Sequence, residues 1–92
     1  MKLEVGALYK HFKGHKYKVL MVAKDASTLE DMVIYQNTDD ESLIWVRPLY
    51  EFTSKVDKIK YPNVKQEYRF EKINDWRSWR NSYISNWLWW NK

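Results

Sequence analysis

Hydrophobic and polar residues alternate along short stretches of the chain with the two-residue period of β-strands. In KYKVLMVA, residues 16–23, one face carries Tyr17, Val19, Met21 and Ala23, which predicts a strand with that face buried. MVIYQ, residues 32–36, predicts a second strand. The polar segment KDASTLED joins the two stretches, so we expect them to form a hairpin.

A third strand is predicted where LIWVRPLYEF, residues 43–52, alternates again. One face carries Leu43, Trp45 and Arg47, and Pro48 has no N–H to donate, so the strand is expected to end, bend or become an edge there. Residues 53–67 are lysine-rich and contain YPN, which indicates a surface excursion. YRFEKI, residues 68–73, predicts a last extended segment that would close a small barrel.

The hydrophobic pattern changes to a helical spacing at the end of the chain, where residues 76–92 hold five of the six tryptophans. Asn74 or Asp75 can cap a helix, and aromatic residues then recur every three or four positions along one stripe. The sequence leaves open three ways to bury the stripe: packing on the barrel, pairing with a second copy, or insertion into a partner or a membrane interface. The predicted partner-binding residues are Trp76, Trp79, Tyr83, Trp87, Trp89 and Trp90.

Length and composition limit the class of protein. A chain of 92 residues with 45% hydrophobic residues supports one domain, here divided into a mainly β barrel over residues 1–73 and an amphipathic α-helix over residues 74–92. The absence of cysteine excludes a disulfide framework, a thiol nucleophile and thiolate metal ligands. No signal peptide and no apolar run of about twenty residues is visible, so we expect a cytoplasmic protein.

Positive charge gathers in YKHFKGHKY, residues 9–17, within a chain of net charge +4. In a binding interpretation, Tyr9 or Phe12 stacks on a base and Lys13, His11 or His15 meets phosphate, with Tyr17 closing the segment. In a structural interpretation the segment is a tight turn, with Gly14 in a left-handed conformation, Phe12 in the core and the lysines in solvent.

Arg47 is the best single polar candidate for ligand binding. Its planar guanidinium can hold a phosphate or carboxylate through two hydrogen bonds, and Trp45 can provide a stacking wall. An ion pair between Arg47 and Glu51 is the structural alternative. The complete set of predicted ligand-binding residues is Tyr9, His11, Phe12, Lys13, His15, Tyr17, Trp45 and Arg47.

The sequence carries no motif for catalysis, metal binding or a cofactor. His11 and His15 are four residues apart, but Gly14 argues against a helix between them and no third ligand follows at a suitable spacing. Asp39, Asp40 and Glu41 lie together in a predicted turn, where acidic side chains are solvated. We therefore expect a protein that is not an enzyme.

Three ordered blocks carry a resemblance to a known family: HFKGHKYKVL at residues 11–20, STLEDMVIY at 27–35 and WVRPLYEF at 45–52. Residues 5–73 resemble domain-of-unknown-function family 1653, short proteins of bacteria and phages. The resemblance implies an SH3-like β-barrel and no established catalytic activity. The chain departs from the family pattern in two connections, with DAST in place of His-Ser-Glu-Thr and NTDDE in place of a Tyr-Gly-Asp turn.

The expected function is that of a non-catalytic binding module, which binds or sequesters a nucleotide or another phosphorylated small ligand. Two alternatives stay open. One is a protein-interaction module that uses the tryptophan-rich helix to bind, and inhibit, a host protein, or to form a homo-oligomer. The other is a nucleic-acid-binding domain that exploits the positive charge.

Overall fold

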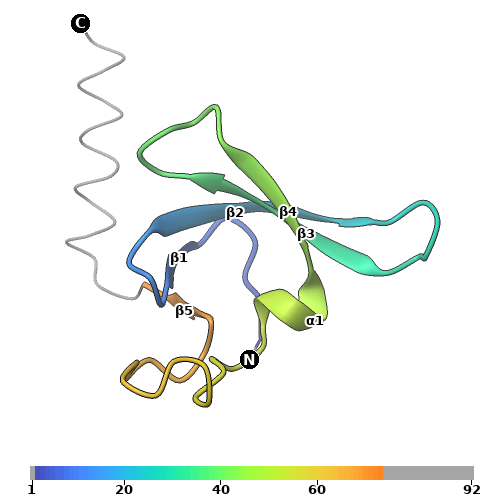
Figure 1. The fold of residues 1–92 in the computed structure, drawn as a ribbon. Coiled ribbons are helices and arrows are strands. Elements are labelled where there is room, and N and C mark those ends of the chain that lie inside the picture. Colours follow the sequence, from blue (N-terminus) through green and yellow to red (C-terminus); the bar gives the residue numbers. More distant parts are fainter. Residues whose placement is uncertain (1, 74–92) are drawn as a thin grey trace, which may run out of the picture.

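The computed structural model describes residues 2–73, which form five antiparallel strands and one short helix (Figure 1). The strand order is β4-β3-β2-β1-β5: the first four strands follow one another as a meander, and the chain then returns to pair β5 with β1. The fold is mainly β, as predicted. The elements are β1 (Leu8–His11), β2 (Lys16–Lys24), β3 (Asp31–Asn37), β4 (Ile44–Pro48), α1 (Leu49–Phe52) and β5 (Phe70–Lys72).

Four of the strands coincide with the alternating stretches of the sequence. The predicted hairpin is formed by β2 and β3, β4 ends at Pro48, and β5 lies inside the predicted segment 68–73. β1 was not predicted, because its residues begin with the adjacent buried pair Leu8 and Tyr9 and then enter the basic segment. α1, which turns the chain directly after Pro48, was not predicted either.

The basic segment, for which a ligand-binding loop and a tight turn were both considered, is a β-hairpin. Tyr9 on β1 lies opposite Tyr17 on β2, and Gly14 in the connection has a φ of 106°, a conformation that glycine adopts without steric cost. The left-handed turn at Gly14 is thereby confirmed. The expected place of Phe12 in the core is wrong, since its side chain is only half-buried at the edge of the turn.

The predicted closed barrel is not formed by residues 2–73. β4 and β5 lie at opposite ends of the strand order, and within this range no ladder joins them. Figure 1 shows a curved sheet instead, with α1 and the long connection to β5 lying below it. β5 has only three residues and pairs with β1 along one edge, so it offers a short second edge for closing a barrel.

A register shift interrupts the alternation of β2. Val19 lies opposite Tyr35, and both are buried. The shift between Val19 and Met21 adds one residue to β2, so Val22, instead of Met21, lies opposite the buried Val33. Met21 is therefore 50% exposed on the other face, and the predicted buried face of β2 is correct only as far as the bulge.

The core is built mainly from aromatic rings. Phe52 of α1 and Phe70 of β5 stack with their centroids 4.0 Å apart and their planes 7° from parallel, and both side chains are buried. Tyr9 and Tyr35 meet the Phe52 ring edge-on at 5.5 and 5.3 Å. The buried Tyr9 hydroxyl accepts a hydrogen bond of 2.9 Å from the Glu4 N–H, so the ring is inside without an unpaired polar group.

The predicted C-terminal helix and all of its predicted partner-binding residues lie outside the described residues, in 74–92. Within residues 2–73, no helix is long and apolar enough to cross a membrane.

The aromatic stack leads to a stability prediction. Phe52→Ala should lower the free energy of unfolding by about 3–5 kcal/mol, because it removes a buried ring and leaves a cavity. Tyr50→Ala, in the same helix but with Tyr50 70% exposed, is the matched control and should change it by about 0.5 kcal/mol or less. Urea unfolding measures both. Equal effects of the two substitutions would mean that the stack does not carry the core.

Candidate anion-binding site

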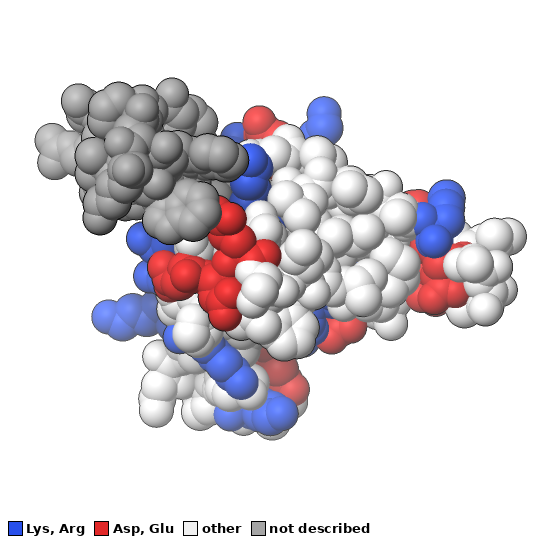
Figure 2. All heavy atoms as spheres, turned by 90° about the horizontal axis from the view of Figure 1, so that it is seen from above, with Lys and Arg blue, Asp and Glu red and all other residues white. Residues whose placement is uncertain are grey.

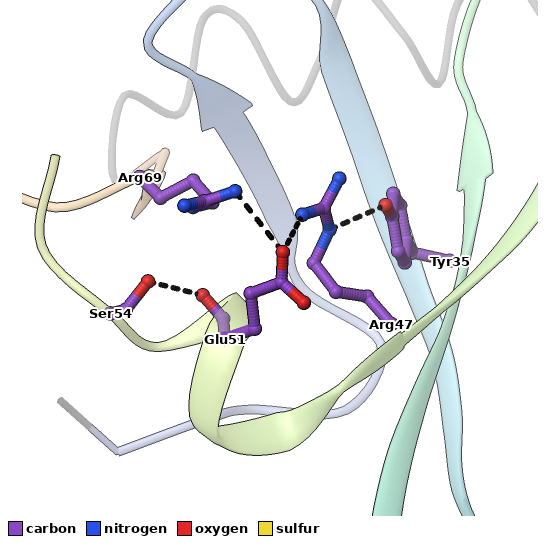
Figure 3. Close-up of polar contacts among 5 residues, drawn as sticks. All are labelled: Tyr35, Arg47, Glu51, Ser54 and Arg69. Carbon is purple, nitrogen blue, oxygen red and sulfur yellow. Dashed lines mark hydrogen bonds and ion pairs between the residues drawn. The ribbon is translucent and has the colours of Figure 1, made fainter. Parts of the chain in front are cut away.

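The main polar cluster of the described chain joins two arginines through one carboxylate. The Glu51 Oε1 lies 2.6 Å from Arg47 Nη1 and 3.3 Å from Arg69 Nη1 (Figure 3). Arg47 comes from the end of β4, Glu51 from α1 and Arg69 from the residue before β5. All three side chains are partly buried, so water screens their charges less than at the open surface.

Local chain geometry brings Arg47 and Glu51 together. Pro48 ends the strand with a φ of −55°, and α1 then turns back, so Glu51 lies one helical turn after Arg47 and beside it. Arg69 is placed by its backbone, whose N–H donates to the Ser54 carbonyl at 2.9 Å and whose carbonyl accepts from the Phe12 N–H at 3.1 Å. The ion pair between Arg47 and Glu51, weighed above as the structural alternative, is confirmed.

Two tyrosines border the Arg47 guanidinium. Arg47 Nε donates to the Tyr35 hydroxyl at 3.1 Å, and the Tyr17 ring meets the Tyr35 ring edge-on at 5.2 Å. Burial acts to lower the pKa of Arg47, but the hydrogen bond with Tyr35 and the charge of Glu51 outweigh it and raise that pKa. Burial, with the neighbouring Tyr35, raises the pKa of Tyr17. At neutral pH the site therefore carries the positive charge of Arg47 close to the neutral phenol of Tyr17.

The charges of the cluster do not balance. Two guanidiniums share a single carboxylate, and the buried Nε of Arg69 has no hydrogen-bond partner in the described part of the chain. A buried donor without a partner costs stability. A guanidinium whose charge is not neutralised attracts anions that offer two oxygens to its planar fork of N–H groups. Chemically, the cluster is suited to hold a phosphate or a carboxylate.

His11 adds a neutral ring to the same region. Its pKa is lowered from 6.5 to about 4, and burial is the largest cause. Nearby positive charges lower it further: those of Arg47, Lys13, Arg69 and His15. Its Nδ1 accepts the Lys13 N–H at 3.1 Å, and its ring lies edge-on to Phe70 at 4.8 Å. At neutral pH, His11 thus offers a hydrogen-bonding ring, not a positive charge, to any ligand.

The structure separates the predicted ligand-binding residues into three groups. Trp45 lies opposite the buried Tyr35 and so shares the face of Arg47, with 48% of its surface exposed; Tyr17 and His11 lie at the same region of the core. At the hairpin turn, Phe12 packs on Tyr61 with centroids 4.9 Å apart, Lys13 Nζ lies 5.7 Å from the Tyr61 ring centre, and His15 is exposed.

Tyr9 forms the third group by itself. Its side chain has no exposed surface and its hydroxyl is occupied by the Glu4 N–H, so the prediction that Tyr9 stacks on a ligand is wrong for this conformation. The physical reason is that β1 lies between β2 and β5 in the sheet, and the Tyr9 ring packs against the Phe52 ring on the core face.

Sequence reasoning missed Arg69. It precedes Phe70 in YRFEKI, where strict alternation would turn its side chain away from the core. Because β5 starts only at Phe70, Arg69 is not bound by that alternation and reaches Glu51. The sequence did carry one indication of this contact, because a charged residue directly precedes a phenylalanine both in Glu51-Phe52 and in Arg69-Phe70. Within residues 2–73, no three potential metal-ligating side chains lie together.

Comparison with known proteins gives one match. A family model described as "Protein of unknown function (DUF1653)" matches residues 7–72, a range that contains all five strands and α1. No curated protein and no solved structure matches the chain.

The lowered pKa of His11 predicts a pH dependence of stability. In the unfolded chain the imidazole takes up a proton near its ordinary pKa of 6.5, whereas in the folded chain it does so only near 4. The unfolded state therefore binds more protons between these values, and the free energy of unfolding should fall as the pH drops from about 6.5 to about 4.

His11→Gln should flatten that slope, whereas removal of the exposed His15 by His15→Gln should leave it close to that of the original protein. Urea unfolding at a series of pH values measures the difference, with carboxylate titration common to all three proteins. An unchanged slope in His11→Gln would contradict the burial effect.

Proposed function

We propose that the chain, which belongs to the DUF1653 family of proteins of unknown function, is a non-catalytic binding module for a nucleotide or another phosphorylated small ligand. The observation that carries the proposal is the pair of arginines that share one carboxylate. The two guanidiniums and the one carboxylate leave one positive charge unmatched, and a bound phosphate would neutralise it and supply acceptors for both guanidiniums.

Aromatic surface beside the cluster favours a ligand with a ring over free phosphate. Trp45 is two residues before Arg47 on the same face of β4 and about half exposed, and Tyr17 is partly exposed across the sheet. Stacking of a base on an exposed aromatic ring stabilises a complex by about 1–3 kcal/mol. A nucleotide would use both surfaces, its phosphate on the arginines and its base on Trp45.

We also infer an SH3-like architecture for the binding module. The meander of β1 to β4, the short helix after β4 and the return of β5 to β1 support it. The stack of Phe52 on Phe70 supports it too, because it seals the core at the place where the sheet is open. In this architecture the arginine cluster lies at the seam between α1 and β5.

Nucleic acid is a second candidate, favoured by one feature of the first hairpin. Lys10 lies directly opposite Lys16, and Lys18 follows on the same face. Like charges placed opposite one another destabilise a sheet, and an anionic backbone would relieve that repulsion. Glu71, opposite Lys10 on β5, offsets part of it, which is why the arginine cluster remains the stronger argument.

A thermal-shift screen against nucleotides tests the proposal. A binding nucleotide at a hundred times its Kd should raise the free energy of unfolding by about 2.7 kcal/mol, and Arg47→Ala should abolish this gain. Lys24→Ala removes the same charge from the pair of Lys24 with Asp31, at the far hairpin, and should keep the gain.

The response to salt separates the two candidates. Binding of a small nucleotide should change modestly with salt, whereas binding of nucleic acid should fall steeply, in proportion to the phosphates neutralised. The absence of any response to nucleotides, in a protein that folds, would refute the proposed ligand class.

Substitution of Glu51 should strengthen anion binding. A ligand phosphate competes with the Glu51 carboxylate for both guanidiniums, and Glu51→Gln removes the competing charge. We expect about fivefold tighter binding, equivalent to about 1 kcal/mol for a partly exposed pair, measured by titration calorimetry. Glu67→Gln, which removes a carboxylate from the pair with Lys55, is the control and should leave the affinity unchanged. Weaker binding in Glu51→Gln would show that Glu51 is itself a ligand contact.

A further inference from the structure

In the part of the chain that the structure describes, the outer edge of β4 is apolar from Ile44 to Val46. Within residues 2–73 the strand pairs with β3 alone, and Ile44, Trp45 and Val46 are 54%, 48% and 62% exposed. Natural sheets usually protect an edge with charged side chains or a bulge. The one charge on β4, Arg47, is engaged with Glu51 and Tyr35. In Figure 2 a continuous uncharged area lies between groups of charged side chains.

The direction of the backbone groups on this edge follows from the ladder. The Asn37 N–H donates to the Leu43 carbonyl at 3.0 Å, so the residues at odd positions of β4 turn their polar backbone groups toward β3. Ile44 and Val46 then turn their N–H and carbonyl groups outward. Pro48, which has no N–H, occupies the next outward position, where its missing donor costs β4 no bond to β3.

We infer that β4 pairs with β4 of a second copy of this chain, antiparallel about a twofold axis at Trp45. In this register Ile44 of each copy exchanges both of its outward hydrogen bonds with Val46 of the other, and Trp45 lies opposite its own counterpart. All outward donors and acceptors of Ile44 and Val46 are satisfied. Centring the axis on Val46 would instead place Ile44 opposite Pro48, which cannot donate.

A second copy fits this edge better than a charged partner. The strand is its own complement, since apolar residues at positions 44 and 46 face each other when it is reversed, and an isologous contact of this kind closes after two copies. Each copy carries a net charge of +4, so their mutual repulsion is weakened by salt. Self-association should therefore strengthen as salt rises, opposite to the binding of an acidic partner or nucleic acid.

The contact is small, which sets its expected strength. Trp45 at half exposure contributes roughly 100 Å² per copy, about half of an aromatic side chain, and a standard interface buries about 800 Å² on each partner. We therefore expect a dissociable dimer whose population rises with protein concentration over the micromolar range. This inference does not rest on the proposed ligand.

The test uses the full chain and substitutions at the outward position Val46. Val46→Pro removes an outward N–H and leaves the ladder to β3 intact, so it should reduce dimerisation at least tenfold in sedimentation equilibrium. Val46→Thr, which keeps the N–H and the β-branched shape, should dimerise with a Kd within about threefold of the original. Circular dichroism checks that both variants fold. A monomer at all concentrations, or a dimer unaffected by Val46→Pro, would overturn the inference.

Cross-linking reads the register directly, because the chain has no cysteine of its own. Facing residues at a site without hydrogen bonds have Cα atoms about 4.5 Å apart, within disulfide range. With copper phenanthroline as oxidant, Trp45→Cys should form a covalent dimer faster than Ile44→Cys or Val46→Cys. Faster cross-linking of Val46→Cys would overturn the axis at Trp45, and no cross-linking in any of the three would overturn the pairing itself. A dimer held by residues 74–92 alone would form no disulfide in any of the three variants.

Discussion

The stack of Phe52 on Phe70 is the contact on which the rest of the described structure depends. It joins α1 to β5, two elements that no ladder connects, and the tyrosines of β1 and β3 pack edge-on around it. The edge-on pairs add to the free energy of burial because the positive edge of one ring meets the negative face of another, and the parallel stack adds close contact between two ring faces. A small domain with few aliphatic residues in its core gains its packing from these rings.

The polar cluster is a consequence of this stack. Glu51 and Arg69 each precede one of the stacked phenylalanines, so fixing the two rings also fixes the distance between the two charges. Arg47 then lies over the Phe70 ring, 5.8 Å from its centre, while it contacts Glu51 and Tyr35. The aromatic core therefore lies directly beneath the charged cluster, and disturbing the core would move the guanidiniums on which the proposed anion binding depends.

Among the described strands, the same arrangement leaves β4 as an open edge. Aromatic packing, and not strand pairing, holds β5 near α1, so the backbone groups of Ile44 and Val46 on the outer edge of β4 stay unpaired by β5. The side chains of Trp45 and Arg47 lie on the core face of the sheet, and those of Ile44 and Val46 lie on the opposite face. Ligand binding and self-association would thus use neighbouring residues of one strand. Pro48 separates the two uses, since it ends the edge and starts the helix that carries Glu51.

The sequence by itself determined what depends on neighbouring residues: the strands β2, β3 and β4 from their alternation, the turn at Gly14 and the end of β4 at Pro48. It also indicated Arg47 and its partner Glu51, which are close along the chain. Only the tertiary structure decided the burial of Tyr9, the bulge in β2, the open sheet and the approach of Arg69 to Glu51. These features depend on which strands pair and which rings meet across long stretches of chain, and a local pattern of residues contains no measure of those distances.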